Sequence, residues 1–160
     1  MTNTTTNETY LFVVPCGGSK LDQPAPAREL YTGTYFRELL GAAEIEAAAT
    51  TVALGVEVRV MILSALHGLV DLDDVLDPYD VTMTGPNSVS VDRLALQLRD
   101  LAVDDLEVYA FLPRAYHDRL RAAADYAFEV ELVDDLVLVH DVFEAAPGIG
   151  YQKSVAAGLR

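Results

Sequence analysis

The sequence predicts a single α/β domain with three α/β/α layers and a mostly parallel sheet of four or five strands. Short apolar runs, typical of buried strands, alternate along the chain with longer amphipathic stretches that are typical of helices. The 160 residues are 51% hydrophobic and 22% charged, which is enough apolar surface for one core. Because β-α-β crossovers are right-handed, such alternation gives a parallel sheet covered by helices on both faces.

Two strands and the first crossover are predicted in the N-terminal part of the chain. Residues 10–15 are an apolar run bounded by Cys-Gly-Gly-Ser, as in a strand buried on both faces. Residues 25–31 are expected to hold a short turn of helix, and Thr34 to cap a longer helix rich in Ala, Leu and Glu. Residues 56–63 form the second predicted strand, which opens into a long loop over residues 65–87.

The C-terminal part continues the alternation. Ser88 or Ser90 is expected to cap an amphipathic helix whose leucines recur on one face. The remaining predicted elements are a strand at residues 107–113, a helix at 114–125, a strand at 128–132, a possible fifth strand at 136–139 and a closing helix at 148–159. We expect residues 1–9 to form a disordered tail and residues 10–160 to form the single domain.

The charge and the cysteine content exclude several classes of function. The formal net charge is -14, from 25 acidic and 11 basic residues, and such a field repels an extended nucleic-acid duplex. The single cysteine, Cys16, can form neither an intramolecular disulfide nor a cysteine-based metal site. The polar N-terminal residues lack a signal-peptide pattern, and no apolar run is long enough to span a membrane. We therefore expect a cytoplasmic protein that needs no cofactor or metal; the oligomeric state stays open.

The first polar loop follows the first predicted strand. Gly17 and Gly18 permit backbone N–H groups to converge, Ser19 adds a hydroxyl and Lys20 an ammonium, which are the ingredients of a cradle for an anion or a carbonyl group. The pattern is neither a P-loop nor a dinucleotide fingerprint. Two interpretations stay open for Cys16: a nucleophile with a depressed pKa, or the commoner small buried side chain.

The second polar loop follows the second predicted strand. His67 follows Ser64 closely and is a candidate general acid or base. A Ser-His hydrolase is formally possible, but a G-x-S-x-G elbow is absent. The acidic run between residues 71 and 77 lacks the glycine and the terminal glutamate of a calcium-binding loop, so it is interpreted mainly as a solvated face.

Aromatic and charged residues nearby suit a planar ligand. Tyr79 and Asp80, after Pro78, can stack on a ring and hydrogen-bond to it, although such a pair more often packs its own loop. Two interpretations stay open for Arg28 and Tyr31: a phosphate-binding pair, or an ordinary pair of surface residues. Three further tyrosines, at positions 109, 116 and 126, are expected in the core. Because ligands bind beyond the carboxyl ends of parallel strands, we expect the two polar loops to meet there.

Four stretches and a closing motif together resemble a known pattern. They are Pro-Cys-Gly-Gly-Ser-Lys at residues 15–20, Pro-Ala-Pro-Ala-Arg-Glu-Leu-Tyr at 24–31, Leu-Ser-Ala-Leu-His-Gly-Leu-Val at 63–70, Pro-Tyr-Asp-Val-Thr-Met at 78–83 and Gly-Ile-Gly-Tyr-Gln-Lys at 148–153. The chain resembles an uncharacterised phage and prokaryotic domain family related to the YaaA-type peroxide-stress proteins. It is more distantly similar to the catalytic domain of archaeosine synthase and to the uracil-DNA-glycosylase-like fold. The resemblance implies a nucleobase or nucleoside pocket, although Leu66 stands where the family often has a basic residue.

We therefore expect a glycosylase-like protein that acts in base excision, exchange or modification. Asp80 or Asp74 would stabilise oxocarbenium-like charge or activate water, Tyr79 would stack on the base, and His67 or Ser19 would contact its carbonyl edge. The other expected ligand-binding residues are Cys16, Gly17, Gly18, Lys20, Arg28, Tyr31, Ser64, Gly68, Gln152 and Lys153. The negative charge favours a free nucleotide, a single-stranded end or a flipped-out base as partner. The alternatives are a non-catalytic binder, either a DNA-associated stress factor or a nucleotide-sequestering module, and, less favoured, a hydrolase built on Ser64 and His67 or a scaffold without pocket chemistry.

Overall fold

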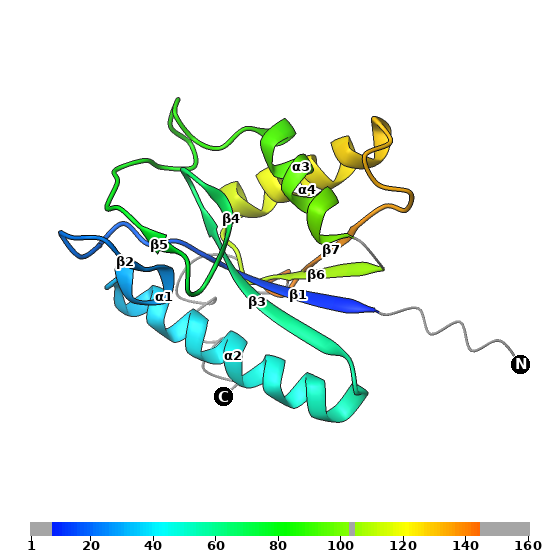
Figure 1. The fold of residues 1–160 in the computed structure, drawn as a ribbon, viewed down its shortest axis with the longest axis horizontal. Helices are drawn as coiled ribbons and strands as arrows, with labels where there is room; N and C mark the ends of the chain where they lie inside the picture. Colours follow the sequence, from blue (N-terminus) through cyan, green and yellow to red (C-terminus); the bar gives the residue numbers. More distant parts are fainter. Residues whose placement is uncertain (1–7, 103–104, 145–160) are drawn as a thin grey trace, which may run out of the picture.

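A five-stranded sheet forms the middle layer of the protein (Figure 1). The computed structural model describes residues 8–102 and 105–144. The central strand β1 (Thr9–Pro15) is parallel to β3 (Glu57–Ser64) on one side and to β6 (Leu106–Ala110) on the other. Beyond β6 lies the parallel strand β7 (Leu138–Asp141), whereas β4 (Gly68–Asp71) pairs antiparallel with β3 at the opposite edge. The predicted mostly parallel sheet is thus confirmed, with one antiparallel pair.

Helices cover both faces of the sheet, as the three-layer prediction requires. The short α1 (Ala27–Leu30) and the long α2 (Thr34–Leu54) lie on one face, and α3 (Val91–Leu101) and α4 (Arg114–Glu129) lie on the other (Figure 1). The predicted cap of α3 is confirmed at Ser90, whose side chain accepts a hydrogen bond from the backbone N–H of Arg93. Among the described residues, no helix combines the length and the apolar character needed to cross a membrane.

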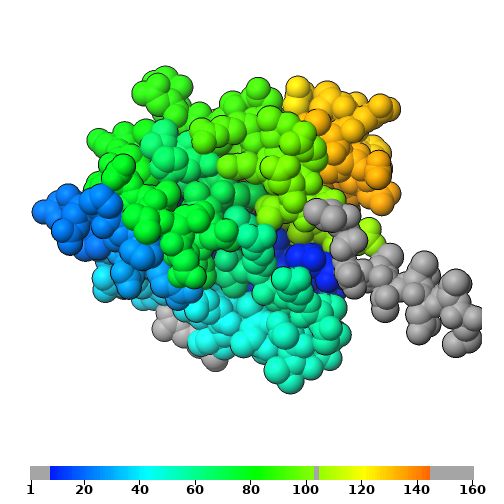
Figure 2. All heavy atoms as spheres, in the orientation of Figure 1, coloured from blue at the N-terminus to red at the C-terminus, as the bar shows by residue number. Residues whose placement is uncertain are grey.

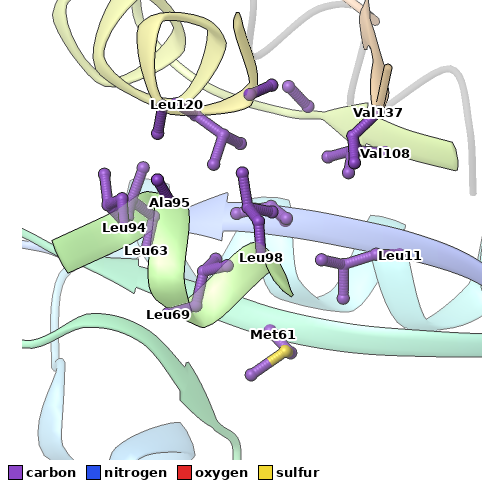
Figure 3. Packing of buried hydrophobic residues seen from close by; sticks show 14 of the residues in the cluster. Leu11, Met61, Leu63, Leu69, Leu94, Ala95, Leu98, Val108, Leu120 and Val137 are labelled. Carbon is purple, nitrogen blue, oxygen red and sulfur yellow. The ribbon is translucent and has the colours of Figure 1, made fainter. Parts of the chain in front are cut away.

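The core has two halves because β1 is buried on both faces. Leu11 and Val13 pack toward α3 and α4, and the alternate residues Phe12 and Val14 pack toward α2. Figure 3 shows the first half, in which leucines of α3 and α4 lie against β1, β3 and β6. Burial of each such leucine contributes roughly 2 kcal/mol. The wholly apolar run that predicted this strand therefore reflects its two buried faces.

The predicted loop over residues 65–87 is only partly a loop. It contains β4 and a short strand β5 (Val75–Leu76), which pairs with β2 (Ala25–Pro26) in a separate two-stranded sheet. The chain can reverse directly after β3 because Gly68 adopts φ +75°, a conformation that other residues rarely take. Two strands of two and four residues show too little alternation to be recognised in a polar sequence.

The predicted strand at residues 128–132 is wrong. α4 continues to Glu129, because its small apolar positions recur with the helical period as far as the buried Ala127, whereas Phe128 and Val130 stay about half exposed. Glu131, at φ 62°, then ends this segment, and the last described strand is β7. The N-cap of α2 is Gly33 and not Thr34, which the sequence predicted.

Other predicted boundaries shift by a few residues. β1 begins at Thr9, inside the expected tail, and β6 covers residues 106–110 of the strand predicted at 107–113. The closing helix predicted at 148–159 and residues 1–7 of the expected tail lie outside the described residues.

The turn at Gly68 depends on a glycine for a second reason. A Cβ atom at this position would lie 2.2 Å from Oε1 of Gln97 and 3.1 Å from Leu94. The Gln97 amide accepts a hydrogen bond from the N–H of Leu69 at 2.9 Å and donates one to the carbonyl of His67 at 3.0 Å, so it ties the turn to α3. A side chain at residue 68 would break this connection.

We predict that Gly68→Ala lowers the free energy of unfolding by roughly 2–4 kcal/mol, from left-handed backbone strain and the displaced Gln97 contacts. The matched control is Gly41→Ala inside α2, where nothing lies within 4 Å of the added Cβ, and it should raise stability by roughly 0.5–1 kcal/mol. Urea denaturation of both variants measures the difference. Equal effects of the two substitutions would contradict this account of the turn.

Candidate binding site

The two polar loops meet at the carboxyl ends of β1 and β3, as expected from the parallel pairing of these strands. Cys16, directly after β1, donates its backbone N–H to the carbonyl of Leu63 at 3.1 Å. The backbone N–H of Ala65, directly after β3, points at the Cys16 sulfur at 3.4 Å. Figure 2 shows the blue segment around residue 20 and the green segments that follow β3 side by side at this rim.

A chain of three hydroxyl groups forms the centre of the site. The Ser64 Oγ lies 2.6 Å from the Tyr79 hydroxyl, which lies 2.5 Å from the Tyr31 hydroxyl. Ser64 and Tyr31 are almost fully buried, and Tyr79 is half-buried. These residues come from the end of β3, from the segment after α1 and from the loop before α3, so their hydroxyls connect three separate stretches.

The hydrogen-bond donors and acceptors of these three hydroxyl groups can be counted. The Ser64 Oγ accepts hydrogen bonds from the backbone N–H groups of Leu66 at 3.2 Å and His67 at 3.0 Å, which occupies both of its lone pairs. Ser64 must therefore donate its own proton to Tyr79. Because one proton suffices for the bond between Tyr79 and Tyr31, one of the two phenol protons has no acceptor among the described residues. The cluster thus has one unused hydrogen-bond donor.

Lys20 places an ammonium group over this cluster. Its Nζ lies 4.5 Å from the centre of the Tyr79 ring and 5.8 Å from that of Tyr31, and it donates to the carbonyl of Gly18 at 3.3 Å. No carboxylate of the described residues forms an ion pair with Lys20. Lys20 therefore keeps its charge free of a carboxylate partner among the described residues, in a chain of net charge -14.

His67 contributes its ring to the wall of the cluster. The imidazole meets the Tyr79 ring edge-on, with 5.5 Å between the ring centres. Burial lowers the pKa of His67, with a further lowering from Arg93, so the ring is neutral at pH 7. The backbone N–H of His67, and not its ring, contacts the Ser64 hydroxyl, so this geometry gives no support to a Ser-His nucleophile pair.

Tyr116 is a site residue that the sequence analysis assigned to the core. Its hydroxyl lies 3.3 Å from the Cys16 sulfur. Burial, followed by the proximity of Cys16, raises the pKa of Tyr116 above its ordinary value of 10.0. The sequence feature that could have identified it is its position in the first turn of α4, which begins at Arg114 after the N-cap Pro113, just beyond the carboxyl end of β6. Such a residue faces the rim at which ligands bind.

Several predicted site residues lie apart from the hydroxyl chain. Arg28 is exposed and pairs with Asp73 and Glu44. The Asp74 carboxylate accepts from the N–H of Asp71 within its own turn. The remaining predicted residues either flank the cluster as part of its loops (Gly17, Gly18, Ser19 and Gly68), are exposed next to Tyr79 (Asp80), or lie outside the described residues (Gln152 and Lys153).

The described residues contain no group of three His, Cys, Asp or Glu side chains that could hold a metal ion. Two hollows lined by described residues lie away from the hydroxyl cluster. One, of about 460 Å³, lies at the amino ends of the strands and is lined by several carboxylates. The other, of about 340 Å³, lies between α2 and the sheet.

The comparisons with known proteins place the chain in a family without assigning it a function. The model of a family of unknown function (DUF6884) matches residues 11–134, which include both polar loops and α4. No curated protein and no solved structure matches the chain.

We predict a loss of stability at alkaline pH that depends on Tyr31. Burial raises the pKa of Tyr31 from 10.0 to about 12, so the unfolded chain loses this proton before the folded protein does. Stability should fall between pH 10 and 12, with a contribution from Tyr31 of about 1 kcal/mol per pH unit. Denaturant unfolding across this range should show a smaller slope for Tyr31→Phe than for the parent. The control is Tyr126→Phe, because the Tyr126 side chain is exposed on α4 and not in the core as predicted. An unchanged slope in Tyr31→Phe, or an equal change in Tyr126→Phe, would contradict this assignment.

Proposed function

The chain belongs to the family of unknown function DUF6884, and we propose that its hydroxyl cluster binds a nucleobase or nucleotide. The observation that carries the proposal is the unused phenol proton of the Tyr31–Tyr79 pair beside the unpaired ammonium of Lys20. A neutral donor suits the carbonyl edge of a base, and a point charge suits a phosphate group. Bases carry both donors and acceptors on a flat ring, so they are read by hydrogen bonds together with aromatic faces.

The rings of the cluster support a planar ligand. Lys20 lies over the Tyr79 ring, so a base that stacks on Tyr79 would take the opposite face or displace the ammonium toward its own phosphate. The neutral His67 ring beside Tyr79 offers a second wall and a nitrogen that can donate or accept. The backbone at Gly17 and Gly18 completes one side of the site, since Gly18 has nothing within 4 Å of its Cβ position and leaves room for a ligand.

Base excision, exchange or modification of DNA or nucleotides is the reaction class that we propose, in line with the resemblance to YaaA-type proteins and to the glycosylase-like fold. In a glycosidic cleavage, Asp80 would stabilise the positive charge that develops on the sugar. Asp80 is better suited to this role than Asp74, because it directly follows Tyr79 and its carboxylate is exposed, whereas the Asp74 carboxylate is bonded within its own turn. The acidic surface favours a free nucleotide, a single-stranded end or a flipped-out base over extended duplex DNA.

The alternative is a non-catalytic binder, either DNA-associated or nucleotide-sequestering. It is favoured by the composition of the cluster, in which no carboxylate of the described residues hydrogen-bonds to the hydroxyl chain. Hydroxyl groups and an ammonium suffice for binding, but glycosidic cleavage needs a group that stabilises or attacks the sugar.

Binding is tested by thermal shift and calorimetry with a panel of nucleobases, nucleosides, nucleotides and single-stranded oligonucleotides. We expect at least one of these to bind and Lys20→Met to weaken a phosphate-bearing ligand by about ten-fold or more, the value of one charged hydrogen bond. Tyr79→Phe should also weaken binding, whereas the control Tyr126→Phe, at the far end of α4, should bind like the parent. The proposal fails if the whole panel leaves the protein unshifted, or if Lys20→Met and Tyr79→Phe bind normally.

Catalysis is tested by mass spectrometry of free base released from modified and unmodified DNA and from nucleotides. The enzymatic hypothesis predicts that the parent releases base and that Asp80→Asn reduces the rate by a hundred-fold or more, on the order of the loss of one transition-state contact. The matched control is the exposed Asp22→Asn in the first loop. Binding without release would favour the non-catalytic alternative.

A further inference from the structure

The loop that carries Tyr79 contains neither a helix nor a strand. It covers residues 77–89, between β5 and the N-cap of α3. Among the described residues, its backbone makes one hydrogen bond to the backbone of another segment, from the N–H of Val89 to the carbonyl of Ala65 at 2.7 Å. Its other backbone–backbone bonds close local turns, such as the bond from Gly85 to Thr82. The backbone alone therefore does little to hold Tyr79 in place.

Arg119 of α4 supplies three further contacts to this loop. Its guanidinium donates to the backbone carbonyl of Val89, to the Ser88 Oγ at 3.1 Å and to the backbone carbonyl of Met83 at 3.3 Å. Met83 and Val89 are buried, and the arginine itself is half-buried. One side chain thus holds the loop near its middle and again near its end.

These contacts depend on the shape of the guanidinium and not on a charge partner. No carboxylate of the described residues forms an ion pair with Arg119, although the chain contains 25 acidic residues. Nη1 and Nη2 lie in one rigid plane and direct their N–H groups to three neutral acceptors. A lysine ammonium on a flexible stem lacks this fork, so the position requires arginine.

The guanidinium is connected to the site on both sides of Tyr79. Met83, whose carbonyl it binds, lies four residues after Tyr79 in the same loop. Val89, its other backbone partner, is bonded to Ala65, which directly follows Ser64. Because Ser64 and Tyr79 share the hydrogen bond at the centre of the site, the arginine fixes the chain next to each member of that bond.

The same side of α4 also contacts the first polar loop. Tyr116 precedes Arg119 by three residues, and its hydroxyl lies 3.3 Å from the Cys16 sulfur. Residues three apart are neighbours on one face of a helix. α4 packs beside α3 on this face of the sheet (Figure 1). One helix therefore contacts both loops that form the site.

We propose that Arg119 is a positioning residue, which holds the loop over residues 77–89 so that Tyr79 stays bonded to Ser64 in the arrangement that binds a ligand. Among the described residues, Arg119 donates to none of the three hydroxyl groups, so it acts through the loop. Its effect on binding rests on the proposed function of the hydroxyl cluster. Its effect on the loop does not, because that effect concerns contacts within the protein.

Hydrogen exchange measured by mass spectrometry tests the loop without any ligand. We expect Arg119→Ala to speed the exchange of residues 77–89 by about ten-fold or more, as the loss of a charged hydrogen bond implies, and to leave β1 and β6 unchanged. Arg119→Lys should exchange as fast as Arg119→Ala, and added ethylguanidine, but not ethylamine, should slow the exchange of Arg119→Ala. The matched control is Arg121→Ala at an exposed position of α4, which should exchange like the parent.

Three exchange results would overturn the proposal. The first is a loop that exchanges at the parent rate in Arg119→Ala. The second is parent-like exchange in Arg119→Lys, since a positive charge alone would then suffice. The third is equally faster exchange in β1, β6 and the loop, which would indicate a loss of stability throughout the protein and not the release of one segment.

Binding measurements separate this proposal from the proposed function. For each nucleobase or nucleotide that shifts the parent protein, Arg119→Ala should raise Kd about ten-fold, ethylguanidine should restore it, and Arg121→Ala should bind like the parent. Parent-like binding by Arg119→Ala would overturn the role of Arg119 in positioning Tyr79. If none of the compounds binds to the parent, the proposed function fails, whereas the exchange experiment still decides whether Arg119 holds the loop.

Discussion

The hydrogen bond between Ser64 and Tyr79 is the interaction on which the candidate site depends. Ser64 is fixed at the end of β3 and uses both lone pairs for the backbone N–H groups of the following turn, so it holds that turn and offers its only proton to Tyr79. The Tyr79 hydroxyl is in turn hydrogen-bonded to the Tyr31 hydroxyl. One chain of hydroxyl groups therefore connects three segments that are far apart in the sequence. Lys20 lies over the Tyr79 ring of this chain, and the His67 ring meets the same ring edge-on.

The electrostatics of the site follow from the same arrangement. Burial raises the pKa of Tyr31 to about 12 and also that of Tyr79, so both phenols stay protonated and neutral, and the neutral His67 adds no charge. Lys20 is then the one charged group among the described residues that lies over the cluster. We propose that this ammonium, in a protein of strongly negative charge, favours small or flexible anions over a rigid polyanion.

Part of this arrangement could be predicted from the sequence because it rests on local patterns. The apolar run of β1 and the parallel order β1–β3 follow from burial on both faces, and parallel order alone brings Cys16 and His67 to the same rim. The hydroxyl chain itself could not be predicted, since the distances among Ser64, Tyr79 and Tyr31 depend on how the β4–β5 segment folds back. The position of Tyr116 in the site was not predicted because helical periodicity does not distinguish a core position from one that faces the rim. The end of α4 was predicted too early because an alternating pattern over five residues also fits a helix.

A double-mutant cycle on Ser64 and Tyr79 tests the central claim most directly, with unfolding free energies measured for the parent, Ser64→Ala, Tyr79→Phe and the double variant. Because each substitution removes the same buried hydrogen bond, the account predicts that the double variant loses less stability than the sum of the single losses, by about 1 kcal/mol or more. Losses that add to within about 0.3–0.5 kcal/mol would show that the two hydroxyls are energetically independent and would contradict the account.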